Sequence, residues 1–149
     1  MRKTKIRNKI IESLVGHTDA RWRVGINVKN IEKEADRYPY IEVFTPIEDS
    51  EIISRSILHY QNLLTVSVEI TVQAPYKEIQ EKIDMLCEQV RDVIEADIRV
   101  GELADFIELE KTTIGYDSEG AFNLGRAVMT FKCMYQSRRK EDRGIYGGH

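Results

Sequence analysis

Histidine and cysteine, which most often supply metal ligands, nucleophiles and general bases, are scarce in this sequence. Three histidines and two cysteines occur among 149 residues. Cys87 and Cys133 lie far apart in no metal-ligand spacing, so we expect two buried thiols in a reducing compartment. His17, His59 and His149 stand in unrelated contexts, where structural or exposed histidines are more usual than catalytic ones.

Motifs of the common catalytic and nucleotide-binding classes are also missing. The chain has no glycine-rich phosphate loop, no G-x-S-x-G elbow and no H-E-x-x-H pair. Glu108 and Glu110 are expected on one strand face, where they either bind a cation, exchange protons with a substrate or are simply solvated. The sequence therefore predicts no enzyme, no cofactor and no metal site.

Long apolar runs are absent, so no membrane contact is expected. The N-terminus is basic but lacks the apolar stretch of a signal peptide, which argues against export. Hydrophobic residues make up 42% of the chain and charged residues 32%, as in ordinary soluble proteins. We expect one domain over residues 1–136 and a basic, flexible tail over 137–149.

Positive charge is concentrated at the two ends of the chain. Residues 1–9 carry +5 and residues 137–149 carry +2, which leaves −10 for residues 10–136 because the whole chain carries −3. Cations in the first turns of a helix also oppose its dipole. Basic ends on an acidic body are consistent with contacts between copies, with an anionic surface, or with solvated tails.

The clearest pattern runs from Leu63 to Ala96. Apolar side chains alternate from Leu64 to Val72, which predicts a strand with one buried face and one threonine-rich face. After Pro75 the period changes, and a single apolar stripe predicts a helix over residues 76–96. Its members are Ile79, Ile83, Leu86, Val90 and Val93.

The remaining elements follow from weaker versions of the same patterns. We expect a first helix over 3–15 and strands over 24–28, 38–45, 106–113 and 124–135. Residues 17–23 and 116–120 are expected to be a loop and a turn. Residues 46–56 lack clear periodicity and predict a mobile loop, while 56–60 can begin the long strand early and so form a hairpin arm.

Strands mostly follow strands in this order, which predicts an α+β fold with a mainly antiparallel sheet. About five strands with two helices packed on one face give the simplest closure. The other face would be wet unless another subunit covers it.

The arrangement resembles the tail-terminator, or tail-completion, proteins of long-tailed phages, the family of minor tail protein U. The similarity rests on the basic first helix, on the segment Ile83–Leu86 within the second helix, and on four strands. These strands are Tyr38–Phe44, Leu64–Val72, Phe106–Thr113 and the closing Ala127–Tyr135. It covers residues 3–136 and leaves out the basic extension.

The resemblance implies a structural virion protein, assembled in the host cytoplasm and carried in the tail. Such proteins form a hexameric ring of identical subunits that caps the finished tail tube, stops its growth and presents the head-tail joining surface. The implied partners are the tail tube protein and a head-tail connector or neck protein, with DNA passing through the ring without sequence preference.

Two groups of residues are candidates for these contacts. The expected arm offers a subunit or partner interface made of Glu48, Asp49, Glu51, Arg55, His59 and Tyr60. The basic end offers a contact with the lumen, DNA or a partner, made of Arg138, Arg139, Lys140 and Arg143. Another neck or tail-tube component, or a small metabolic enzyme, remains an alternative function.

Overall fold

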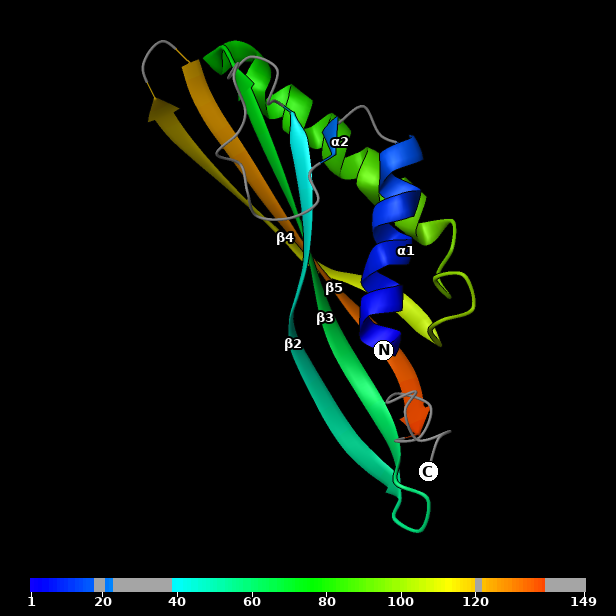
Figure 1. Cartoon of the computed structure of the whole chain (residues 1–149). Coiled ribbons are helices and arrows are strands. Elements are labelled where there is room, and N and C mark those ends of the chain that lie inside the picture. The colour runs from blue at the N-terminus through cyan, green and yellow to red at the C-terminus, as the bar shows by residue number, and fades with distance from the viewer. Residues whose placement is uncertain (18–20, 23–38, 120–121, 139–149) are drawn as a thin grey trace.

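The computed structural model describes residues 1–17, 21–22, 39–119 and 122–138. In chain order the elements are α1 (Arg2–His17), β1 (Arg21–Trp22), β2 (Tyr40–Ser54), β3 (His59–Ala74), α2 (Tyr76–Glu95), β4 (Phe106–Glu119) and β5 (Phe122–Arg138). The strands form one sheet in the order β1-β2-β3-β5-β4. Both helices lie on the same side of this sheet (Figure 1). The predicted α+β class with two helices on one face is confirmed.

Strands β2, β3, β5 and β4 are antiparallel to their neighbours, whereas β1 pairs in parallel with the first two residues of β2. β3 and β5 pair along their whole length without a register shift, from His59 opposite Arg138 to Ala74 opposite Asn123. Side chains on directly opposed residues share a face. The alternation expected around Leu64 is therefore extended in register across the centre of the sheet.

The core lies between the helices and the sheet. The predicted apolar face of β3 is buried from Leu64 to Val72, together with Phe131 and Cys133 on β5. α1 buries Ile6, Ile10 and Leu14. α2 buries the apolar stripe expected for it, with Ile94 taking the fully buried place predicted for Val93. The described residues contain no helix with the length and apolar character required to cross a membrane.

Several predicted loops and turns are wrong. Residues 46–54 belong to β2, and 116–119 belong to β4. β2 carries two irregularities, between Phe44 and Ile47 and between Ile52 and Ser54. Each extra residue moves the following side chains to the other face, so the strand shows no continuous period of two in its sequence.

Other expectations were affected by neighbouring strands or fall outside the described residues. Part of the predicted 17–23 loop is the two-residue strand β1, and β5 continues to Arg138, two residues into the predicted tail. The expected strand over 24–28 lies outside the described residues. Thr65 and Thr71, on the face expected to be wet, are 6% and 3% exposed.

α2 comes close to the sheet above Gly125 of β5. A methyl group added there would lie 2.3 Å from Ile83 Cδ1 and 3.0 Å from Ile79 Cγ1, both side chains of the buried stripe. Packed interiors tolerate such additions poorly because a well-filled core has no free volume. Gly125 therefore sets how closely the helix and sheet can approach.

We expect Gly125→Ala to lower the free energy of unfolding by about 1–3 kcal/mol, because the helix must move or its isoleucines must leave their rotamers. Urea denaturation measures the change. Gly115→Ala is the matched control, since its methyl group would meet nothing within 4 Å. The control should stay within about 0.5 kcal/mol of wild type. Equal losses in the two variants would contradict the close approach.

Candidate functional site

The most distinctive feature is a projecting part of the sheet that the helices do not cover. β3 has 16 residues and spans about 53 Å at about 3.3 Å per residue, whereas the 20 residues of α2 span about 30 Å. The excess forms a projection, which we call the arm: residues 46–54 of β2, the turn 55–58, residues 59–64 of β3 and 133–138 of β5. At its base Leu64 and Cys133 still belong to the buried core and β4 still pairs with β5, whereas beyond Met134 the arm consists of three strands. It extends away from both helices (Figure 1).

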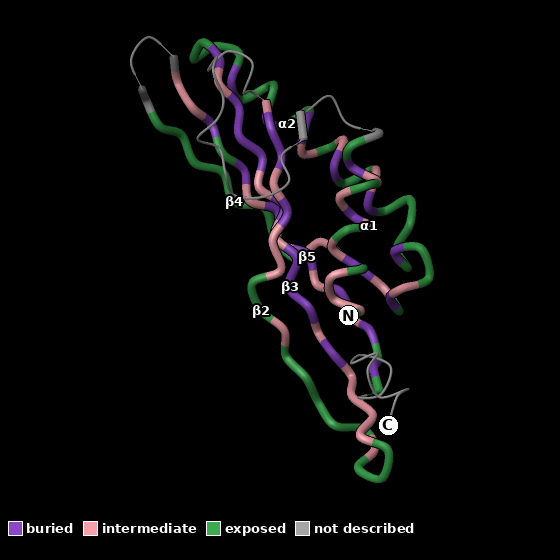
Figure 2. The backbone as a smooth tube through the Cα atoms, viewed as in Figure 1, coloured by how far each residue is buried: buried purple, intermediate pink, exposed green. Residues whose placement is uncertain are grey.

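The structure contains a hairpin where an arm was predicted, but its first side is the strand 46–54 and not a loop, and the long strand begins at His59 after the turn 55–58. Its outer strand is exposed along most of its length, while the paired strand β3 is half-buried or buried (Figure 2). The turn places Leu58 at φ 47°, in the left-handed region that residues other than glycine rarely occupy. Strand pairing on both sides of the turn holds this residue in place.

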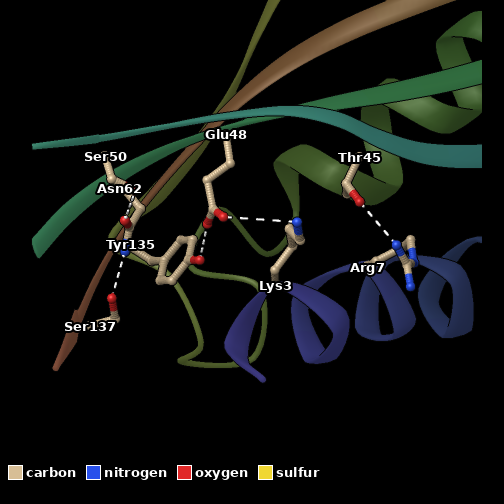
Figure 3. A network of polar contacts seen from close by, with 8 residues as sticks. All are labelled: Lys3, Arg7, Thr45, Glu48, Ser50, Asn62, Tyr135 and Ser137. Atoms are coloured by element: carbon tan, nitrogen blue, oxygen red, sulfur yellow. Dashed lines mark hydrogen bonds and ion pairs between the residues drawn. The ribbon is translucent and has the colours of Figure 1, made fainter. Parts of the chain in front are cut away.

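Three side chains fasten the base of the arm to α1, and we call them the clasp: Lys3, Glu48 and Tyr135. The Tyr135 hydroxyl donates a hydrogen bond to Glu48 Oε1, and Lys3 Nζ lies 3.9 Å from Glu48 Oε2 (Figure 3). One turn further along α1, Arg7 donates to Thr45 Oγ1 over 3.0 Å. The clasp thus joins a helix, an edge strand and an inner strand.

A second polar row crosses the arm two residue pairs beyond Glu48, where Asn62 stands opposite Tyr135 of the clasp. Ser50 donates to Asn62 Oδ1 over 2.6 Å, and Asn62 Nδ2 donates to Ser137 Oγ over 2.8 Å (Figure 3). Asn62 and Ser137 are buried. Polar pairing therefore replaces apolar packing where the sheet leaves the core, and each row fixes the strands by specific partners.

The six candidate interface residues differ in their exposure and in their contacts within the chain. Glu48 belongs to the clasp and is therefore committed within the chain. Asp49 and Glu51 are exposed on β2 and form no ion pair with any described residue, and Arg55 is exposed in the turn. His59 and Tyr60 are half-buried, opposite Arg138 and Ser137 of β5.

The basic end is described only in part. Arg138 is exposed as the last residue of β5, opposite His59 near the tip of the arm. The structure therefore brings one member of the predicted basic group next to the predicted interface group. Arg139, Lys140 and Arg143 lie outside the described residues.

Sequence reasoning missed the most exposed apolar side chains of the arm. Ile47, Ile52, Ile53 and Ile57 are between 40% and 53% exposed. The signal was available, since four isoleucines within eleven residues of an acidic segment are unusual for a solvated loop. They were not assigned to a surface because the double irregularity in β2 hid the strand.

No catalytic arrangement emerges from the described residues. They contain no group of three or more potential metal ligands. Glu108 lies opposite Lys132 on β5, and Lys132 Nζ lies 3.6 Å from Glu110, so one of the two acids is already paired with a cation. A half-open depression of about 300 Å³ on the sheet, over β3, β5 and β4, has one carboxylate, Asp117, and one cation, Arg126, among its described lining residues.

Both cysteines are free thiols. Burial, and to a smaller degree the charge of Asp105, raises the pKa of Cys133 to about 12. Burial, with a smaller effect of Asp84, raises the pKa of Cys87 to about 11. Because thiolates are the nucleophilic form, neither thiol is activated at neutral pH.

Comparison with known proteins adds no relative. No protein-family model matches this chain, and no curated protein matches it.

We expect Tyr135→Phe to lower the free energy of unfolding by about 0.5–1.5 kcal/mol, because Glu48 loses a buried donor. Tyr60→Phe is the matched control on the same arm and should leave stability unchanged. Combining Tyr135→Phe with Glu48→Gln should cost less than the sum of the two single changes, as measured by urea denaturation. Additive losses would show that the hydroxyl and carboxylate do not interact.

The thiols provide a pH test of the packing. In the unfolded chain they ionise near the ordinary value of 9.0, and in the native state only near 11 and 12. Their contribution to stability is therefore complete below pH 9 and lost as pH rises from 9 towards 12. We expect negligible reaction of native Cys133 with a thiol reagent at pH 8. Rapid labelling of that residue without unfolding would contradict the burial.

Proposed function

We propose that this chain is a structural protein of a long-tailed phage or a tail-like particle, of the tail-terminator kind. In this role it forms a ring, caps the tail tube, ends its polymerisation and presents the surface that joins the head. The proposed partners are further copies of the chain, the tail tube protein and a head-tail connector or neck protein. The virion tail is the corresponding location.

One observation carries this proposal: the arm projects from the body and exposes isoleucines beside charged residues, of which Asp49, Glu51 and Arg55 form no ion pair with any described residue. Ile47, Ile52 and Ile53 are exposed on its outer strand beside Asp49 and Glu51. A projection of this composition costs solubility unless it contacts another protein, because exposed apolar clusters mark interaction sites. The clasp supports the same role, since it fixes the direction in which the arm leaves the body.

The uncovered face of the sheet gives the molecule two different sides, as the proposed ring requires. Helices cover one face only, and the described part of the other face mixes threonine and charged residues with half-buried Phe44 and Leu63. The basic residues at the end of β5, beginning with Arg138, are proposed to face DNA in the lumen or an acidic neighbour.

Electron microscopy of the purified full chain mixed with tail tubes tests the proposal. We expect one ring on one end of each tube and no further growth of capped tubes. Extension of the tubes by this protein would identify a tube subunit instead, and particles that never contact tubes would overturn the proposal.

We expect Ile52→Asp combined with Ile53→Asp to abolish ring formation while leaving the circular dichroism spectrum and the unfolding midpoint unchanged. The reason is that both side chains are exposed and contribute little to the core. Ile98→Asp is the matched control, because Ile98 is 50% exposed but lies outside the arm. Normal rings from the double variant would exclude the arm as the contact.

A further inference from the structure

We propose that the tip of the arm docks on the outward side of α2 in a second copy of this chain. The tip comprises Ile53, Arg55, Ile57 and Arg138. The receiving surface, which we call the α2 stripe, comprises Glu81, Asp84, Glu88 and Asp92. The inference rests on the self-association in the proposed function and names the surfaces that carry it.

The tip is apolar and basic. Ile53 and Ile57 are 46% and 50% exposed, and both arginines are exposed. Neither Arg55 nor Arg138 forms an ion pair with any described residue. No acidic residue occurs from Ile52 to Tyr60. As far as the described residues go, the charges of Arg55 and Arg138 are therefore available for acids on another surface.

The α2 stripe has the complementary charge. Its four acids recur at spacings of three and four, which places them on one side of the helix, and the buried residues of α2 lie on the opposite side. All four are exposed, and none is paired with a described cation. Glu78 and Glu95, by contrast, have partners in Lys82 and Arg91, at 3.9 Å and 2.7 Å.

The stripe is not purely charged. Met85, 45% exposed, lies one residue after Asp84 and offers an adaptable apolar contact for the isoleucines. The pKa of Arg91 is raised first by its hydrogen bond and charge contact with Glu95, and further by Asp92 and Glu88. The negative field of the stripe thus already acts on a neighbouring cation.

The two surfaces cannot meet within one molecule. α2 packs over the half of β3 and β5 that carries the core, whereas the tip lies at the far end of the same strands (Figure 1). A contact between different surfaces of identical chains is head-to-tail, and it repeats until the rotation closes a ring or continues as a helix. This is the symmetry that a ring-shaped cap needs.

The edges of the sheet are less suitable for joining copies. The outer edge of β2 carries Glu48, Asp49 and Glu51, and the outer strand β4 carries Glu108 and Glu110. Pairing β2 with β2, or β2 with β4, would bring two acidic strands together, and like charges on opposed residues destabilise strand pairs. Charge therefore favours docking of the tip on the helix over extension of the sheet.

Sedimentation velocity of the purified full chain at about 50 mM salt measures the self-association, since low salt leaves exposed charges least screened. We expect Arg55→Glu with Arg138→Glu to raise the dissociation constant about tenfold, and Asp84→Lys with Glu88→Lys to do the same. Combining all four changes should restore association to within a few-fold of wild type. Lys111→Glu on β4 controls for net charge and should have little effect.

Rescue by the fourfold charge swap, with each pair of changes disruptive alone, supports the proposal. A wild-type chain that stays single at about 100 μM would overturn it, as would reversed charges without effect, or folded single-surface variants that the swap fails to rescue. The proposed function can fail separately: association through these surfaces with no binding to tail tubes would remove the cap and leave the docking contact.

Discussion

The seating of α2 on the paired strands β3 and β5 is the constraint on which the rest of this structure depends. The apolar stripe of α2 packs on the part of β3 and β5 where every second side chain is apolar. Gly125 allows the helix and the sheet to approach closely there. α2 is about 20 Å shorter than β3 and cannot cover the strands along their whole length, and α1 extends the cover only as far as the base of the arm. The arm is the part of the sheet that projects beyond both helices (Figure 1).

α2 packs mainly on β3 and β5, and α1 supplies the helical contacts to β2. Its basic first turns oppose the helix dipole, yet three cations find acceptors within the chain. Arg2 donates to the Leu103 carbonyl oxygen over 3.1 Å, Lys3 approaches Glu48 and Arg7 donates to Thr45. Much of the basic N-terminus therefore joins parts of one subunit, and it is not simply a solvated tail.

An element was predictable from the sequence when its apolar side chains recur with one period along its whole length. β3 and α2 were predicted closely because each keeps one period from end to end, and their buried residues are nearly those expected. The second half of β2 was lost because two irregularities break its period. β1 was lost because two residues carry no periodic signal.

The candidate site was predictable as a place but not as a set of contacts. Acidic residues and a hairpin marked the region around Glu48, yet Tyr135 lies 87 positions away and was predicted only as the end of the last strand. A hydrogen bond of that separation depends on strand order, which one sequence does not reveal. The isoleucines were misjudged for a related reason, since exposure follows from what covers a strand and not from its composition.

The clasp lies where the arm leaves the body, and it therefore holds the point about which the arm would tilt. If the arm tilted slightly at Glu48, Arg55 at its far end would be displaced by a much larger distance. The contacts of Lys3 and Tyr135 with Glu48 hold the arm at this point. The direction in which the arm projects is therefore set by contacts within its own subunit. In the proposed assembly, copies of the chain would meet with the direction of their arms already fixed, and less conformational entropy would be lost on association.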